Sequence, residues 1–352
     1  MPIESKECFT NLTIDGQLYE IYQAAQSGVA TVTATAPLTS SGGANPDIST
    51  SMATDRILGR TTAGTGVAEE LSVAGNLVLS AGSLTSRASD VQVFSTPGAF
   101  IWTKPDGAKS IHVAVIGGGG GGGSGVMAVA GSPAAGGGGG GGAGRTIATL
   151  QASLLAATEN GFVGPGGAGG VAITSVANGA FGVSGTASYF GLWAFSNGAS
   201  RGGPGNSGTG GAGGVAGARA TYSGGNGAAG SATGNGTAAA ANTVGSTGGG
   251  GGAGTTGLAA ATGGSGAMSQ SYDGGSFFAI VAGANGPSVP TDTPLNGSGG
   301  GGGSSSITAP AMAGGSGGNY GAGGGGGGGG SGFASGAGGD GANGIVVVTT
   351  YF

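Results

Sequence analysis

The chain has 352 residues, a net charge of −5, a single cysteine and 94 glycines. The absence of clustered Lys and Arg argues against nucleic-acid binding, and a single cysteine excludes an intrachain disulfide. No apolar run is long enough to span a membrane, so no membrane insertion is expected. Eleven glycines lie in residues 1–107 and the other 83 in residues 108–352, so the composition changes sharply near Ile116.

The N-terminal third of the chain predicts short β-structure. Residues 10–22 predict a hairpin, because Asp15-Gly16 supplies the positive φ angles of a two-residue turn. Residues 37–51 are loop-like, and residues 52–86 contain short β-type segments between glycine turns, none of which is long enough to bury a core alone. Such a stretch gains stability by winding with copies of itself, which predicts a homotrimer.

Longer strands are predicted on both sides of the glycine-rich region. Residues 91–94, 99–103 and 110–116 precede it, and the unbroken β-branched and aromatic run 345–352 follows it. The composition of this last run suits a buried strand. We expect it to pair with the 91–116 strands and so to close the glycine-rich region.

Residues 117–343 are too rich in glycine for an α-helix, because each glycine costs about 1 kcal/mol relative to alanine. The uninterrupted runs at 117–123, 136–142 and 323–330 lack the periodicity of collagen. Only eight charged side chains follow residue 107, and apolar islands recur, which disfavours a flexible linker. The remaining regular structure is the polyglycine II helix, with three residues per turn and radial N–H and C=O groups. We therefore predict a bundle of such helices with a core of backbone hydrogen bonds.

Several segments carry a family resemblance. Ala36–Ser49 and Arg56–Gly66 resemble recurring segments of tailed-phage fibres. Phe94–Pro105, with Val113–Ile116 and the first glycine run, resembles the entrance to the glycine-rich domain of phage tail-fibre proteins, and Gly338–Val348 resembles its last strand. The chain is thus similar to bacteriophage tail-fibre and adhesin proteins with a polyglycine II domain. The resemblance implies a virion fibre, trimeric in its shaft, whose loops bind bacterial surface molecules.

The predicted fold is mainly β and irregular, with an N-terminal β-hairpin, a thin β stalk and a β-capped polyglycine II helix bundle. Residues 1–35 are expected to attach to other virion proteins. Residues 36–90 form the trimerising stalk, and residues 91–352 form the glycine-rich domain. The first residues carry charges, but the apolar core of a signal peptide does not follow them. Assembly in the host cytoplasm is therefore expected.

The aromatic residues suggest two roles. A compact island is expected to cap the bundle, with a receptor-binding patch as the alternative: Tyr189, Phe190, Trp193 and Phe195. Isolated tyrosines among glycine, serine and asparagine are candidate receptor contacts, because binding loops have this composition. They are Tyr222, Tyr272 and Tyr320.

No catalytic, cofactor or metal site is expected. His112 is the only histidine and Cys8 is remote from it, so neither a zinc site nor a Ser-His-Asp arrangement can be assembled. Asp273 and Asp292 are the closest acidic pair in the glycine-rich domain, but loop-like sequence surrounds them. Glycine patterns typical of dinucleotide sites arise by chance at this composition and lack the alternating strands and helices that such sites need.

Three hypotheses remain. The first is a structural tail fibre or adhesin that attaches the virion to a bacterial surface protein or glycan. The second keeps the fold and places the protein on the capsid, as a head fibre or decoration protein. The third is a non-viral antifreeze or silk-like protein, which the fibre-like 36–105 region disfavours.

Overall fold

The computed structural model describes residues 9–14, 17–22, 38–41, 47–50, 52–66, 68–73, 76–242, 244–267, 283–290 and 295–352. Contacts divide the chain into two compact units, Met1–Arg87 and Ala88–Phe352. This division lies close to residue 90, where the sequence predicts that the stalk ends.

Unit 1 contains antiparallel hairpins. The hairpin predicted at residues 10–22 is confirmed, because Ile14 lies opposite Gln17 across the Asp15-Gly16 pair. Among the described side chains of this unit, none is buried. Each hairpin is a separate two-stranded sheet. The pairs are β1 (Phe9–Ile14) with β2 (Gln17–Tyr22), β3 (Leu38–Ser40) with β4 (Ile48–Thr50), β5 (Arg56–Gly59) with β6 (Glu69–Ser72), and β7 (Leu77–Ser80) with β8 (Ser83–Ser86).

Unit 2 begins with two four-stranded antiparallel sheets. One has the order β13-β11-β18-β9 and the other β10-β14-β15-β16. The strands of the first sheet are β9 (Asp90–Phe94), β11 (Ser110–Ile116), β13 (Arg145–Gln151) and β18 (Ile345–Tyr351). Those of the second sheet are β10 (Gly98–Thr103), β14 (Thr158–Val163), β15 (Ser188–Phe190) and β16 (Ala194–Ser196). A single 3₁₀ turn, η1 (Ala152–Leu154), connects the two sheets after β13.

One hydrophobic core joins the two sheets. Ile111, Val113 and Val115 on β11 pack in the same cluster as Trp102 on β10 and Phe190 on β15. The alternation along β11 follows from the strand period of two, which sends every second side chain to the same face. The rings of Trp102 and Phe190 meet edge to face, with centroids 5.4 Å apart.

β18 pairs with the strands that precede the glycine-rich region, as predicted. Its neighbours are β11 on one side and β9 on the other, both antiparallel. The expected pairing of this strand with residues 99–103 is wrong, because β10 pairs with β14 instead. The turn at Lys104–Gly107, where Gly107 has a φ of 78°, carries the chain from the second sheet to the first.

The glycine-rich region forms extended segments that hydrogen-bond sideways with a period of three residues. In segment 117–126, every third N–H from Gly117 donates to segment 135–144, and every third from Gly118 donates to segment 179–187. The third series, from Gly119, donates to segment 336–344. These donor–acceptor distances are 2.8–3.4 Å. A different neighbour at each successive residue is the pattern of a polyglycine II helix.

The uninterrupted glycine runs form the interior of the bundle. Segment 117–126 also accepts hydrogen bonds from segments 164–170, 197–205 and 323–330, so it has six neighbours. The runs 117–123, 136–142 and 323–330 bond to one another. Outer segments instead expose every third residue, and Pro165, Ala168 and Val171 are exposed in this way. The sequence therefore has glycine at all three positions of the turn only where neighbours surround a segment.

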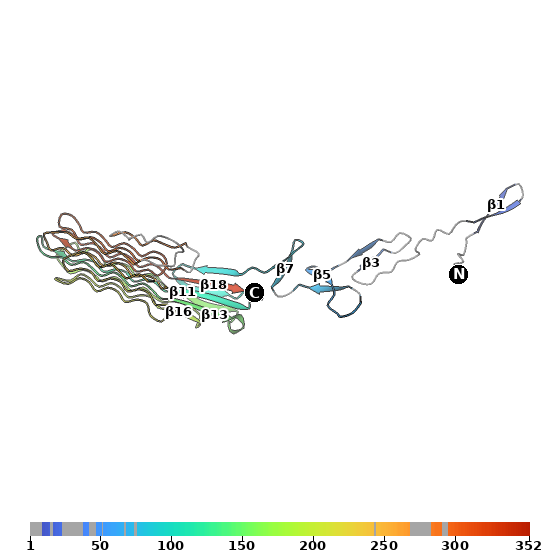
Figure 1. Ribbon diagram of the computed structural model, residues 1–352, viewed down its shortest axis with the longest axis horizontal. Coiled ribbons are helices and arrows are strands. Elements are labelled where there is room, and N and C mark those ends of the chain that lie inside the picture. The colour runs from blue at the N-terminus through green and yellow to red at the C-terminus, as the bar shows by residue number, and fades with distance from the viewer. Residues whose placement is uncertain are drawn as a thin grey trace. The chain divides into compact units, whose positions relative to one another are not determined.

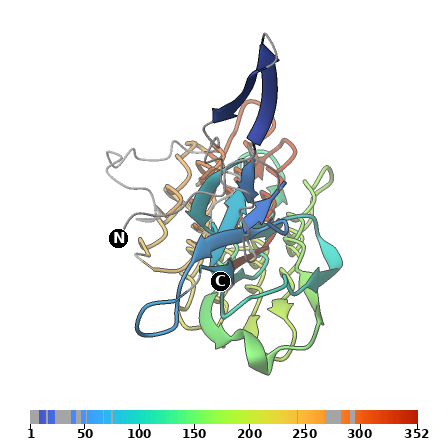
Figure 2. The same ribbon diagram turned by 90° about the vertical axis from the view of Figure 1, so that its right-hand side faces the viewer.

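The segments alternate in direction between two ends of the bundle, which Figure 1 shows as wavy traces running away from β11, β13 and β18. Figure 2 shows them foreshortened, as coils seen along their axes. We call the end with the two sheets the sheet end, and the opposite end the loop end. At the loop end, β12 (Met127–Ala128) pairs in parallel with β17 (Gly330–Ser331).

Candidate binding surfaces

Of the predicted tyrosines, Tyr222 and Tyr320 lie in the described part of the chain, and their environments differ. Tyr222 lies at the sheet end, where its backbone N–H and C=O pair with those of Arg145 at 2.9 and 2.8 Å. Tyr320 is 6% exposed and packs in a buried cluster with Ile116 and Val347, so its ring is part of the core. Tyr272, like Asp273 and Asp292, lies outside the described residues.

The half-buried guanidinium of Arg145 lies beside Tyr222. Burial lowers the pKa of Arg145, and the nearby Tyr222 hydroxyl offsets part of this effect by favouring the charged form. In the described part of the chain, the buried Nε of Arg145 has no hydrogen-bond partner. Since arginine stays protonated in proteins, this group remains a cation at the sheet end.

The aromatic island lies in the β15–β16 hairpin of the second sheet. Phe190 points into the core between the sheets, whereas Tyr189 stacks on Phe162 with ring centroids 6.0 Å apart. Trp193 and Phe195 are partly exposed, and the Arg219 guanidinium lies 5.3 Å from the Phe195 ring centroid. The hairpin connects two glycine segments at the sheet end, so it lies where a cap would be placed.

His112 lies within β11. Its Nδ1 is 3.2 Å from the Thr149 hydroxyl on the neighbouring strand β13. Among the described residues, no group of three His, Cys, Asp or Glu side chains could hold a metal ion. The described part of the chain also contains no helix with the length and apolar character needed to cross a membrane.

The loop end gathers turns from widely separated parts of the chain. Met127 bonds to Ala177, Ala134 to Thr255, Gly332 to Ala128, and Ser331 to Ser306 through backbone groups. The Asn178 side chain accepts a hydrogen bond from the Ser207 N–H at 3.0 Å. The turns linked in this way are 127–134, 171–178, 206–209, 255–260, 306–310 and 331–335. Sequence reasoning missed this grouping, although each turn marks a break in the three-residue glycine pattern.

The loop end is apolar and uncharged in its described residues. No Asp, Glu, Lys or Arg occurs in the turns named above. Large apolar side chains are instead exposed there: Val129, Val171, Val176, Leu258 and Phe333. Leu258 is the most exposed of these, at 83%. A cluster of exposed apolar side chains without charge is typical of an interaction surface.

A hollow of about 560 Å³ opens among these turns. Val126–Val129, Val176 and Ala177 line it with apolar surface, and Asn178 and Ser207 add polar groups at one side. We call this hollow the loop-end pocket. An apolar pocket with a few convergent polar groups is the usual form of a binding site.

Comparison with known proteins identifies the glycine-rich region. No significant match is found among curated proteins. Residues 95–351 match the sequence model of a family described as a glycine-rich domain. This match covers the whole bundle and every strand of the two sheets except β9, from the residue after β9 to the last residue of β18. The chain therefore belongs to this glycine-rich domain family.

Proposed function

We propose that this chain is a non-enzymatic structural fibre protein of a tailed bacteriophage, and that its loop end attaches the virion to the host cell surface. The observation that carries the proposal is the loop end itself. Exposed apolar side chains and a pocket lie on turns that a backbone-bonded scaffold holds in place. The resemblance of residues 36–105 and 338–348 to phage fibre segments supports the virion assignment.

The composition of the loop end favours a protein receptor. Without charged groups in its described turns, this surface has nothing to pair with the phosphates or acidic sugars of a cell envelope. Its exposed valines, leucine and phenylalanine suit the buried, apolar centre of a protein interface. A bacterial surface protein is therefore the preferred partner at this end of the bundle.

Cell binding by the full-length chain tests this proposal. The fluorescently labelled protein is expected to bind saturably to cells of a strain that the phage infects. Leu258→Asp or Val176→Asp is expected to weaken binding by at least about ten-fold, because a charge would be buried unpaired in the interface. Val215→Asp is the matched control, since Val215 is 64% exposed on an outer segment away from the loop end. Equal loss in all three variants, or no binding by the native chain, would contradict receptor attachment.

The position on the virion needs a separate experiment. Electron microscopy of virions labelled with antibody against residues 95–351 is expected to show label on the tail. Label confined to the head would instead assign the chain to a capsid fibre or decoration protein with the same fold.

A further inference from the structure

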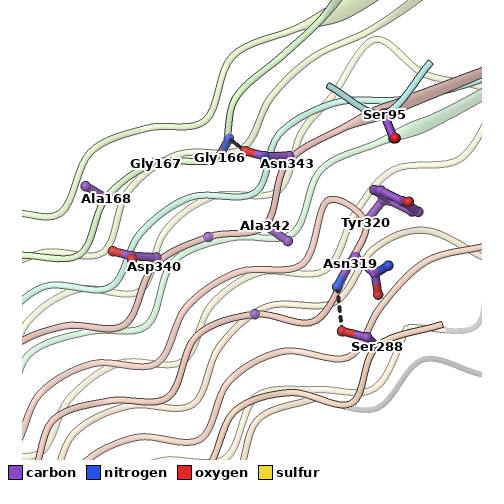
Figure 3. Close-up of a pocket in the computed structure, with 12 residues that line it drawn as sticks. Ser95, Gly166, Gly167, Ala168, Ser288, Asn319, Tyr320, Asp340, Ala342 and Asn343 are labelled. Carbon is purple, nitrogen blue, oxygen red and sulfur yellow. Dashed lines mark hydrogen bonds between the residues drawn. The ribbon is translucent and has the colours of Figure 1, made fainter. Parts of the chain in front are cut away.

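A second hollow of about 590 Å³ lies on the flank of the bundle, near the sheet end (Figure 3). Its polar walls come from four glycine segments and from the residue after β9. The side chains that line it are Ser95, Ser288, Asn319, Tyr320, Asp340 and Asn343. We call this hollow the flank pocket. Its volume lies within the range of roughly 300–1,000 Å³ that small-molecule sites occupy.

The scaffold holds two of these side chains in place through one oxygen each. Asp340 accepts a hydrogen bond from the Gly169 N–H at 2.7 Å through Oδ1, and Asn343 accepts one from the Gly166 N–H at 2.9 Å through its own Oδ1. Figure 3 shows the Asn343 bond as a dashed line. Among the described residues, no partner is found for Asp340 Oδ2 or Asn343 Nδ2. Each side chain is thus fixed in position while one polar atom remains available.

Asn319 also lines the flank pocket. Its backbone N–H donates to the Ser288 hydroxyl at 3.3 Å, which Figure 3 also shows. Its side-chain Oδ1 is buried and has no hydrogen-bond partner among the described residues. Because this oxygen is closed to solvent, it is not available to a ligand in the pocket. The pocket therefore presents an acceptor at Asp340 Oδ2 and a donor at Asn343 Nδ2.

The charge of the lining limits the class of ligand. Among the described residues, no Lys, Arg or His lines the flank pocket and Asp340 is the only carboxylate there, so phosphate and other anions are disfavoured. One carboxylate is also too few for a dedicated Ca²⁺ site, which takes six to eight oxygen ligands and draws several of them from acidic side chains. A neutral ligand with many hydroxyl groups fits both restrictions, because each hydroxyl both donates and accepts a hydrogen bond.

We propose that the flank pocket binds a neutral carbohydrate of one or two sugar units. A sugar hydroxyl would donate to Asp340 Oδ2, and a ring or hydroxyl oxygen would accept from Asn343 Nδ2. This site goes beyond the proposed function, because it is separate from the loop end and uses none of its residues.

Ligand-observed NMR and calorimetry on the full-length chain test the site directly. The probes are glucose, galactose, mannose and N-acetylglucosamine, with glucose 6-phosphate as the anionic comparison. Binding of at least one neutral sugar at millimolar concentration is expected, without binding of the phosphorylated sugar. If none of the neutral sugars binds, or if the anionic sugar binds more tightly, the proposal is overturned.

Matched variants locate the binding. Asp340→Asn keeps the Oδ1 that Gly169 uses and removes the charge, so affinity is expected to fall about ten-fold, as for other lost charge-assisted hydrogen bonds. Asn343→Asp keeps the bond to Gly166 but replaces the free donor with a negative acceptor, and a similar or larger loss is expected.

Asn226→Asp makes the same chemical change outside the pocket. Asn226 is exposed, and its Oδ1 accepts from the Ala216 N–H at 2.9 Å, so this variant is expected to keep native affinity. Thermal unfolding of each variant shows whether the fold is intact. Unchanged sugar affinity in folded Asp340→Asn and Asn343→Asp proteins would overturn the assignment. Cell attachment through the loop end would be unaffected by that result.

Discussion

At the scale of single residues, the fold depends on the absence of a Cβ atom. A Cβ placed on Gly123 would lie 2.0 Å from the Gly203 carbonyl oxygen, far inside van der Waals contact. The same approach recurs at every residue of the run 117–123 because successive residues face successive neighbours. No residue of this run has a positive φ angle. Glycine is therefore required here because neighbouring backbones lie too close to leave room for a Cβ atom.

Alanine substitution separates interior from outer glycines. Gly123→Ala is expected to destabilise the protein by about 3 kcal/mol or more, because the segments would have to separate. At Gly234, an added Cβ would meet only the Ser231 hydroxyl at 3.6 Å. Gly234→Ala is expected to be neutral or to stabilise by up to about 1 kcal/mol, through reduced freedom of the unfolded chain. Calorimetry of both variants checks the contrast, and equal destabilisation would contradict the backbone core.

A second residue-scale prediction concerns Glu69 in unit 1. Its carboxylate accepts hydrogen bonds from the Thr62 hydroxyl, the Thr61 hydroxyl and the Thr61 N–H. These bonds lower the pKa of Glu69, and the Thr62 bond has the largest effect. A lowered folded-state pKa means that the ionised form stabilises the loop. This contribution is present above the ordinary carboxyl pKa and is lost as the pH falls through the lowered value.

NMR spectra of the loop between β5 and β6 test this dependence. The Thr61 amide signal is expected to shift as the pH falls below the ordinary pKa of glutamate, reporting protonation of Glu69. In Glu69→Gln the same signal is expected to be independent of pH over that range. A native Thr61 signal that does not titrate would contradict the hydrogen-bonded carboxylate.

At the scale of elements, the strands and the backbone bundle were predictable, while the second sheet was not. β-branched runs identify β11 and β18, and the Asp-Gly pair identifies the first hairpin. β10 and β14 carry no comparable signal of their pairing, because Gly161 and Asn160 interrupt the apolar pattern of β14. Pairing across more than 50 residues depends on tertiary packing, which a local pattern does not contain.

The loop end was not predicted for a related reason. Which turns share an end depends on the alternating direction of the glycine segments. The three-residue spacing of exposed side chains, as at Pro165, Ala168 and Val171, shows where an outer segment runs. It does not show which segments lie beside it, because glycine has no side chain that would distinguish one neighbouring segment from another. Tyr320 illustrates the limit: its sequence context is loop-like, yet contacts with Ile116 and Val347 bury it.

The β15–β16 hairpin provides the prediction at this scale. Phe190 is fully buried against Trp102, whereas Leu192 in the same hairpin is fully exposed. Phe190→Ala is expected to lower the free energy of unfolding by about 3–5 kcal/mol through the cavity it leaves. Leu192→Ala is expected to change it by less than about 0.5 kcal/mol. Similar effects of the two substitutions in chemical denaturation would show that the hairpin is not packed on the sheets.

At the scale of the whole molecule, the two units differ in how they are stabilised. Unit 2 has a hydrophobic core and a hydrogen-bonded bundle. The described hairpins of unit 1 instead expose Leu58, Leu77, Val78 and Leu84. An isolated two-stranded hairpin is marginally stable in water, so these side chains need further contacts. Association with copies of the same chain would supply them.

Sedimentation measures this association. The full-length chain is expected to sediment as a trimer, and a chain that begins at Ala88 is expected to be a folded monomer. Leu77→Ser combined with Leu84→Ser is expected to shift the full-length protein toward monomer without changing the unfolding of unit 2. A native full-length chain that sediments as a folded monomer would contradict the trimer.

The position of β18 has a consequence for synthesis of the protein. The ribosome completes β11 at Ile116, but the strand that lies between β11 and β9 begins 229 residues later, at Ile345. Contacts so distant in sequence form slowly, and this one cannot form at all until translation has passed through the entire glycine-rich region. A nascent chain that stalls before Ile345 leaves β11 without its central partner and remains open to proteolysis. Only a chain translated through β18 can therefore complete this sheet.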